Sequence, residues 1–492
     1  MLVLHLIIEP EAEERMIKVK VVQAVIHASS LEKLHELENY NLDLARSSAK
    51  QTKDDDYSVS GILSAEQAEL LKKEGYTLEI ELDATDIPAQ RLQEVYHGNR
   101  LESESQAANF TAESVRGGYM TVDEIDNILL QLSRQNPGLV SLITLPNRTW
   151  EGRTCRAVKL SAAPQQARVK PAILITGNVH AREWGGSDIC INLLTKLVQA
   201  YTSRQPIQYG NKSFAYEQIK QALESVDLII FPEVNPDGKV YCQENHGQDS
   251  LNDQLAGNGF WWRKNRRPDE NGRPMGVDLN RNFDFLWGST IGTSADKNSL
   301  VYLGPAPFSE PESQNIKYLL DTYPQIRFYV DIHSFGEKIM FNWGDDNNQT
   351  TDPGQNFLNQ QYRGIRGASG KSSQTIKDSY KEYITPQDEK LERELGNRMN
   401  SALQAVRGKS YKVEESAQLY YTSGTTQDYA YSRHLSDPSK PKIYSYTFEF
   451  GITFVPPYEE MKLIIADLSS ALTELTYAVS QINALEPVRP GN

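Results

Sequence analysis

The sequence predicts an α/β fold in which helices cover an open sheet, and a smaller α/β unit precedes it. Two buried strands carry this prediction: residues 171–180 (PAILITGNVH) and 327–333 (RFYVDIH) are apolar runs of strand length. Residues 187–201, directly after the first run, repeat apolar side chains at helical spacing. A strand, a polar loop and a helix is the unit from which open α/β sheets are built. At 492 residues the chain has room for one large domain and one small one.

The first 96 residues form a separate unit of alternating strands and helices. Apolar alternation predicts strands, and leucines at helical spacing predict helices. The expected order is βαβαβ, from strand 18–29 through helix 31–45, strand 57–64 and helix 65–75 to strand 76–83. Residues 97–116 are rich in Ser, Glu, Asn and Ala, which is typical of a linker. A second, larger domain is expected over residues 117–488.

Candidate metal ligands follow each of the two buried strands. His180 and Glu183 lie in the motif HARE after the first strand, and His333 ends the second. Because such strands end at one edge of the sheet, we expect these side chains to meet. A catalytic zinc takes three protein ligands and keeps a fourth position for water. The sequence therefore predicts a zinc site, against the alternative of a chance HxxE motif and a packed core histidine.

Glu449 is the candidate general base. It lies in a third strand, residues 445–450 (SYTFEF), where a period of two places Ser445 and Thr447 on its face. A zinc ion lowers the pKa of bound water to roughly 7. A neighbouring carboxylate can then take the proton of that water and pass it to a leaving amine. The alternative is a solvated glutamate on an edge strand.

Several further motifs, in this order along the chain, resemble the zinc metallocarboxypeptidases of the carboxypeptidase A/B type. The resemblance runs from about Gly118 to about Pro487. The motifs are HAREW (180–184), NPDG (235–238), WRKNR (262–266), GVDLNRN (276–282), DIHS (331–334), YYTSGTTQDYAY (420–431) and YTFE (446–449). The resemblance implies a mixed eight-stranded sheet flanked by helices, with the βαβαβ unit in front of it.

The resemblance also implies an activity, the release of single residues from the C-termini of peptides and proteins. One Zn²⁺ per chain would be held by His180, Glu183 and His333. Glu449 would be the general base. The other implied roles are oxyanion stabilisation by Arg266, binding of the terminal carboxylate by Asn280 and Arg281, closure over substrate by Tyr420, and orientation of His180 by Asp278. It further implies a cis peptide bond between Ser334 and Phe335.

By the same resemblance, Gln427 lines the floor of the pocket for the C-terminal side chain. Matching by position adds Asp331, Gly344, Glu415, Leu419, Thr422 and Thr447. Two of these residues are acids, and an acid in a pocket favours a cationic guest. We therefore expect a broad or polar-to-basic preference. Residues 345–386 are longer and more polar than the family minimum, and we expect this insertion to border the cleft.

Two further functions are consistent with the same motifs. One is a zinc amidohydrolase or cell-wall peptide peptidase of this fold. The other is an inactive peptide-binding homologue. Asn280, Arg281 and Tyr420 argue against the first, because they serve a free carboxylate, and Glu449 argues against the second.

The position of the first domain resembles the pro-segments of the family, which fold over the active site. A permanent accessory domain is the equal alternative. If an activating protease acts, we expect it to cut in the linker, at Arg100 or Arg116. A pro-like domain favours an extracellular location, whereas the apolar N-terminus lacks the pattern of a signal peptide.

Composition excludes several classes of partner. The net charge of −14 argues against nucleic acid, which requires clustered Lys and Arg. No run approaches the roughly 20 apolar residues of a membrane helix. The three cysteines have no metal-ligand spacing. We expect a monomer that acts on peptide or protein C-termini.

Overall fold

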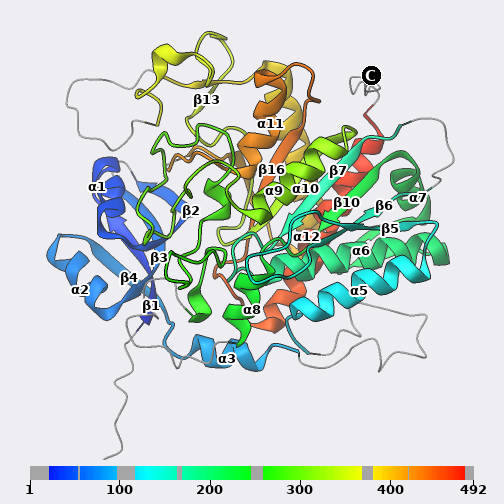
Figure 1. Ribbon diagram of the computed structural model, residues 1–492, viewed down its shortest axis with the longest axis horizontal. Coiled ribbons are helices and arrows are strands. Elements are labelled where there is room, and N and C mark those ends of the chain that lie inside the picture. Colours follow the sequence, from blue (N-terminus) through cyan, green and yellow to red (C-terminus); the bar gives the residue numbers. More distant parts are fainter. Residues whose placement is uncertain are drawn as a thin grey trace, which may run out of the picture.

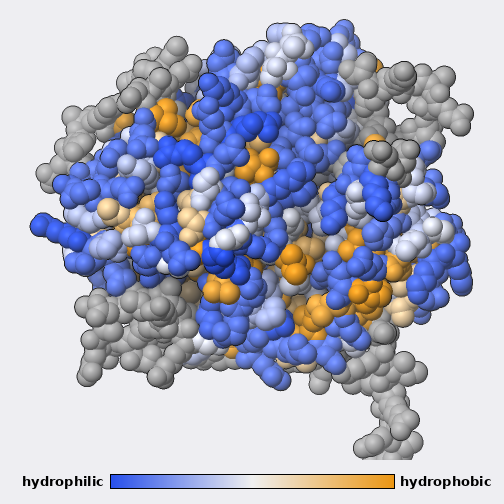
Figure 2. Space-filling model, turned by 180° about the vertical axis from the view of Figure 1, so that it is seen from behind, coloured by the Kyte–Doolittle hydropathy of each residue, from blue (hydrophilic) through white to orange (hydrophobic). Residues whose placement is uncertain are grey.

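The computed structural model describes residues 21–53, 56–96, 117–162, 169–244, 259–367, 380–418 and 420–482. A small N-terminal domain packs against one side of a larger α/β domain (Figure 1). Seen from behind, the surface is mainly hydrophilic, with apolar side chains in a few small patches (Figure 2). The proposed cut sites Arg100 and Arg116 lie outside the described residues.

The N-terminal domain is a four-stranded antiparallel sheet in the order β2-β3-β1-β4, with helices against one face. Its elements are β1 (Val21–Ala28), α1 (Leu31–Glu36), η1 (Leu37–Tyr40), β2 (Asp43–Lys53), β3 (Asp56–Ser64), α2 (Ala65–Lys73) and β4 (Thr77–Asp83). Helix α3 (Ile87–Gln93) leads towards the larger domain. Ser64 begins α2 with a capping box that also involves Gln67.

The expected βαβαβ order is wrong by one strand, because the observed order is βαββαβ. The predicted helix over 31–45 ends at Tyr40, where Asn41 adopts a left-handed conformation with φ of 48°. Residues from Asp43 onward then form β2. Leu42 and Leu44 fit both a helical and an alternating pattern, and both are buried in the sheet core. Their spacing therefore does not distinguish a helix from a strand.

The larger domain contains the predicted mixed eight-stranded sheet, in the order β15-β12-β16-β11-β7-β10-β6-β5. The four central strands, β16, β11, β7 and β10, are parallel. The strands are β5 (Val140–Thr144), β6 (Arg156–Leu160), β7 (Ala172–Gly177), β10 (Asp227–Phe231), β11 (Ile326–Ser334), β12 (Lys338–Phe341), β15 (Lys412–Glu415) and β16 (Tyr444–Phe450). Strands β7, β10 and β11 are buried along their whole length, as expected of parallel strands covered on both faces.

Helices cover both faces of this sheet and bury two apolar clusters. The first cluster lies beneath α5 (Val122–Gln135), α6 (Gly185–Ser203), α7 (Tyr216–Ser225), α10 (Pro386–Arg407) and α12 (Tyr458–Ser480). The second lies beneath α9 (Pro311–Thr322) and α11 (Thr426–Ser436). The remaining elements are short: β8 (Ile207–Tyr209), β9 (Lys212–Phe214), α8 (Pro236–Glu244), η3 (Gly259–Trp261), η4 (Leu279–Arg281), β13 (Asn348–Gln349), η5 (Gln360–Tyr362) and β14 (Glu382–Tyr383).

Helix α12 is long and apolar enough, by length and composition, to cross a membrane, but 72% of its apolar window is buried in the fold. It packs against α6, α7 and α10. These contacts explain its composition as that of a core helix.

The parallel strands bring the predicted ligands to one edge of the sheet. Strand β7 ends at Gly177, three residues before His180, and β11 places His333 directly opposite Glu449 on β16. A Cβ on Gly177 would lie 2.8 Å from the backbone of Gly186, so glycine allows helix α6 to start against the strand. The Ser334–Phe335 peptide bond is cis, as the resemblance implied.

Strand β2 of the N-terminal domain lies over this edge and makes polar contacts with it. Asp43 forms a bidentate ion pair with Arg182, whose second bond, from Nη2 to Oδ1, is 2.7 Å long. Both side chains are buried, and the Arg182 guanidinium also lies 3.8 Å from the centre of the Phe454 ring. The Ser47 hydroxyl donates to the carbonyl of Phe335 at 2.7 Å. The two domains are therefore joined beside the predicted metal ligands.

Asp43→Asn is expected to loosen this contact between the domains. Removing one partner of a buried ion pair costs about 3–5 kcal/mol, because the other charge stays buried and unpaired. Hydrogen-exchange mass spectrometry should show faster exchange over residues 43–53 in the variant. Glu66→Gln, an equal charge change at an exposed position on α2, is the control. Equal exchange in both variants would contradict this role of Asp43.

Candidate active site

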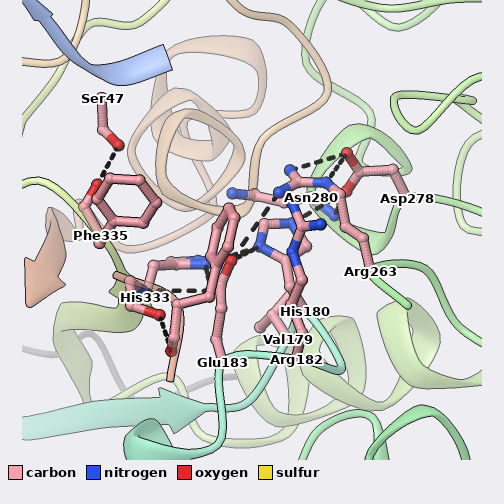
Figure 3. Close-up of polar contacts among 12 residues, drawn as sticks. Ser47, Val179, His180, Arg182, Glu183, Arg263, Asp278, Asn280, His333 and Phe335 are labelled. Atoms are coloured by element: carbon pink, nitrogen blue, oxygen red, sulfur yellow. Dashed lines mark hydrogen bonds and ion pairs between the residues drawn. The ribbon is translucent and has the colours of Figure 1, made fainter. Parts of the chain in front are cut away.

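The three predicted metal ligands converge on one buried point (Figure 3). His180 Nδ1 lies 2.8 Å from Glu183 Oε1 and 3.1 Å from His333 Nδ1. His333 Nδ1 lies 2.9 Å from Glu183 Oε2. Each of the three side chains is at most 4% exposed.

The opposite nitrogen of each imidazole faces a carboxylate. His180 Nε2 lies 3.1 Å from Asp278 Oδ1, and His333 Nε2 lies 2.8 Å from Asp331 Oδ2. A carboxylate is an acceptor, so Nε2 of His180 carries the proton and its Nδ1 presents a lone pair, and the ion-pair contact with Asp331 favours the same tautomer of His333. Asp278 also receives two bonds from Arg263, at 3.0 and 3.1 Å. Although burial opposes it, Arg263 and His180 hold the pKa of Asp278 well below its usual range.

This arrangement fits a metal ion. Two imidazole lone pairs and a carboxylate about 3 Å apart repel one another unless a cation lies between them. Two nitrogens and one carboxylate match the donor set of a catalytic zinc, which leaves one position open. Although burial disfavours a charged imidazole, Asp331 and Glu183 hold the pKa of His333 well above its usual range. The surroundings of His333 therefore favour positive charge at this point. Among the described residues, this is the one group that satisfies the geometry of a metal site.

Glu449 lies on the wall of the pocket next to this site. Its side chain comes from β16, paired in register with His333, and its Oε2 is buried without a hydrogen-bond partner. Burial raises its pKa to about 8, against the opposing effect of His333. A carboxylate in this position faces the metal site with an oxygen that is not engaged elsewhere.

The pocket also brings together four residues predicted to bind substrate: Asn280, Arg281, Tyr420 and Gln427. Arg281 is held rigidly, with Nε donating to the carbonyl of Gly292 at 2.9 Å and Nη1 to that of Asn280 at 2.6 Å. The Asn280 carbonyl Oδ1 accepts from the backbone N–H of Thr426. That bond directs the donor end of the amide away from α11.

The prediction for Arg266 is wrong. The Arg266 side chain lies outside the pocket, 3.6 Å from the centre of the Tyr241 ring, and Nε bonds Glu151 at 3.2 Å. Arg263 lines the pocket instead, and its Nη1 lies 3.9 Å from Glu183. Both arginines belong to the segment WRKNR, where no regular element fixes the direction of a side chain, so the sequence pattern does not indicate which guanidinium faces the pocket.

The two acids expected in the pocket lie elsewhere. Asp331 is buried behind His333, where it accepts a bond from Thr176 Oγ1 at 2.7 Å. Glu415 accepts from the backbone of Asn348. Of the other positional matches, Thr422 and Thr447 line the pocket, Gly344 does not, and Leu419 lies outside the described residues. The sequence analysis missed Lys338, Met340, Ser416 and Gln418. Alternation along β12, where Lys338 and Met340 share one face, was the signal for the first two.

The described part of the 345–386 insertion does not line the pocket, so the expectation that it borders the cleft is not supported. Some of its acidic residues turn inward. Asp345 and Glu382 are fully buried, and the Tyr380 hydroxyl donates to Glu382 at 2.5 Å. The insertion packs beneath the pocket through Asn348, whose side chain donates to the carbonyl of Asn342.

Comparison of the sequence with known proteins identifies the family. A zinc carboxypeptidase family model matches residues 125–468. The chain is 29% identical over 318 residues to carboxypeptidase B of Helicoverpa zea, a match that covers 64% of this chain and 60% of that protein. It is 27% identical over 361 residues to carboxypeptidase A2 of Rattus norvegicus, covering 72% and 69%.

Two solved structures share the fold. Carboxypeptidase A from Helicoverpa armigera superposes with a TM-score of 0.69 at 21% identity, covering 95% of this chain and 99% of that one. Thrombin activatable fibrinolysis inhibitor superposes with a TM-score of 0.66 at 20% identity, covering 94% and 100%. Since both alignments span nearly the whole chain, the likeness extends to the N-terminal domain.

Asp331→Asn is expected to weaken metal binding about 10- to 100-fold, the usual effect of removing a carboxylate that orients a ligating histidine. A competition titration of Zn²⁺ against a chromogenic chelator measures the change. Glu415→Gln, the other acid once expected in the pocket, should leave the affinity unchanged. Equal affinities in the two variants would show that Asp331 does not support His333.

Proposed function

The chain belongs to the zinc carboxypeptidase family, and we propose that it hydrolyses the last peptide bond of peptides and proteins to release one C-terminal residue. The observation that carries this proposal is a shared pocket, which is lined by His180 and Glu183 of the metal-ligand group and by Arg281. An exopeptidase needs both features, because it must activate water and recognise a free carboxylate at a fixed separation.

Zinc bound by these three residues would polarise the substrate carbonyl and activate a water molecule. Glu449 is proposed as the general base that takes the proton of the water and delivers it to the leaving amine. Its support is position, since it lies opposite His333 in the β11–β16 pair and its Oε2 is buried without a hydrogen-bond partner. The protein surrounds this site closely, and this strengthens charge interactions within it.

Arg263, in place of Arg266, is proposed to stabilise the oxyanion that develops on the carbonyl. Its guanidinium lines the pocket, and two bonds to Asp278 fix its position. Because this cation is already in place, little reorganisation of the site is needed when negative charge develops on the carbonyl oxygen. Since Asp278 also holds His180, one carboxylate would align both the metal ligand and the oxyanion donor.

Asn280 and Arg281 are proposed to bind the terminal carboxylate of the substrate. A guanidinium pairs with both oxygens of a carboxylate, and the amide donor of Asn280 lies beside it. This pairing would position the last peptide bond at the metal site and exclude internal bonds. It also disfavours the amidohydrolase alternative, because an amide substrate would leave Arg281 buried without an anion.

The pocket chemistry favours a polar C-terminal side chain. The Gln427 Oε1 accepts from the hydroxyls of Thr447 at 2.5 Å and Ser416 at 3.1 Å, while its Nε2 is buried without a partner. A guest that brings a hydrogen-bond acceptor would satisfy this donor. The basic part of the original expectation has lost its support, because Asp331 and Glu415 do not line the pocket. We therefore propose a preference for glutamine-like side chains.

The N-terminal domain is proposed to restrain the activity while it is docked. Residues 44–47 and Ala49 of β2 line the same pocket as the metal ligands. The Tyr420 hydroxyl, expected to close over substrate, instead donates to the carbonyl of Leu34 at 3.0 Å. We propose residues 1–96 as the restraining domain, 97–116 as the linker and 117–488 as the catalytic domain. If the domain is a pro-segment, cleavage in the linker would lift the restraint. If it is a permanent accessory domain, undocking without cleavage would lift it.

The proposed function is tested with N-blocked dipeptides ending in Gln, Lys or Phe, each as free acid and as amide. Release of the last residue is measured before and after limited trypsin treatment, with and without a chelator. We expect chelator-sensitive release from the free acids, fastest for Gln, and at least about 100-fold slower release from the amides, because Arg281 recognises the carboxylate.

Each arm of this experiment isolates one part of the proposal. Equal release from acids and amides would contradict carboxylate recognition and favour an amidase. Fastest release of Phe would contradict the role of Gln427. No release by a zinc-loaded, trypsin-treated chain would contradict the enzymatic proposal itself.

Arg263→Gln and Arg266→Gln form a matched pair that tests the corrected assignment. Loss of one oxyanion donor lowers kcat by a factor of about 10²–10³, so the kcat of the Arg263→Gln variant should fall by this factor. Arg266→Gln should retain nearly full kcat, because Arg266 stacks on Tyr241 outside the pocket. Steady-state kinetics on the preferred free-acid dipeptide provide the measurement. The reverse result would return the oxyanion role to Arg266.

A further inference from the structure

Arg281 stays available for an anion while the N-terminal domain is docked. Its guanidinium donates to two backbone carbonyls, and no described carboxylate lies within ion-pair distance of it. The acid that β2 brings closest to the metal ligands, Asp43, is engaged by Arg182 instead. The docked domain therefore covers Asn280 and Arg281, the proposed carboxylate clamp, without neutralising the charge of Arg281.

The docked domain adds a second cation to the same pocket. Arg46 of β2 lines it, and its guanidinium lies 5.9 Å from the centre of the Tyr420 ring. Its ion pair with Glu38 is 3.4 Å long and partly exposed. Tyr420 donates its hydroxyl to the carbonyl of Leu34, so Arg46 and Tyr420 are both held at the domain contact.

Like charges therefore accumulate around one space. Burial lowers the pKa of Arg281 to about 10; Asp278 opposes this shift, and Arg263 and Arg46 add to it. The acids of the pocket are engaged or lie towards its other walls. Asp428 accepts bonds from Asn342, Gly344 and Thr425, and Glu449 and Glu183 lie at the metal end. Guanidinium groups that face one enclosed space are stabilised by an anion between them.

We propose that the docked form is itself a binding site for one small carboxylate, held by Arg46, Asn280 and Arg281. The site rests on the proposed function through Asn280 and Arg281, and Arg46 is its new member. Free volume of about 120 Å³ between the domains suits a ligand of a few heavy atoms. Because the ligand contacts both domains, it binds the docked form more tightly and so favours docking. A released amino acid or another small carboxylate would in this way keep the chain restrained.

Calorimetric titration of the intact, uncut chain with N-acetylglycine tests the site, and N-acetylglycinamide is the ligand control. The titration is repeated on the zinc-free chain, where direct ligation of the metal is removed. We expect binding of the acid, and not of the amide, in both forms. Arg46→Gln should weaken this binding about tenfold or more, the cost of one charge-assisted bidentate contact. Arg46→Lys, which keeps the charge, should recover part of it.

Lys50→Gln provides the matched control, because Lys50 is an exposed cation on the same strand. It should bind the acid within about twofold of the unmodified chain, since an exposed charge outside the pocket is screened. Hydrogen exchange over residues 43–53 should slow when N-acetylglycine is added. This slowing should be present with Lys50→Gln and absent with Arg46→Gln.

The outcomes distinguish the role of Arg46 from that of the carboxylate clamp. Unchanged binding by Arg46→Gln, with binding abolished by Arg281→Gln, would overturn the role of Arg46 and leave the carboxylate clamp intact. Unchanged binding by Arg281→Gln would overturn the clamp itself, and with it carboxylate recognition in the proposed function. Equal binding of the amide would overturn the anion site.

Discussion

The rest of the structure depends on three lone-pair donors that meet in a buried space. His180 Nδ1, His333 Nδ1 and the Glu183 carboxylate lie about 3 Å apart, an arrangement that a cation stabilises. The surrounding structure holds them there. Strand β7 ends just before His180, β11 carries His333, and Asp278 and Asp331 fix the two rings from behind. Arg263, Glu449 and the carboxylate clamp are arranged around this point, so their proposed roles have meaning only if it holds zinc.

The sequence predicted the parts of this site that regular structure positions. His180, His333 and Glu449 lie in or just after buried parallel strands, where the apolar pattern indicates both the element and the edge at which it ends. Arg263 and Arg266 lie in an irregular segment, and no periodicity indicates which guanidinium faces inward. Asp331 illustrates a different limit. Alternation places it on the same strand face as His333, but only the packing shows that its carboxylate reaches Nε2 of that ring.

The fold shows the same division between regular and irregular structure. Strands β1, β3 and β4 were predictable from alternation, and the buried strands β7 and β11 from apolar runs, while the mixed eight-stranded sheet was implied by the family resemblance. Strand β2 was hidden because its leucines also fit a helix. The missing strand is the one that lies over the site. Sequence patterning alone therefore located the N-terminal domain and left out the element by which it contacts the pocket.

The contact between the domains uses groups that belong to the site. Arg182 adjoins the ligand Glu183 and binds Asp43, while Tyr420 packs into the apolar core of the N-terminal domain. Docking and the proposed substrate binding would therefore compete for Tyr420. This competition provides a physical basis for restraint without any distortion of the metal ligands.

X-ray absorption at the zinc edge, on the intact chain loaded with one equivalent of Zn²⁺, tests the central claim most directly. The account predicts two nitrogen ligands at about 2.0–2.1 Å and carboxylate or water oxygens at about 2.0–2.2 Å. His333→Ala should remove one nitrogen from this shell. A shell of oxygens alone, any sulfur ligand, or an unchanged spectrum in the variant would contradict the proposed metal site.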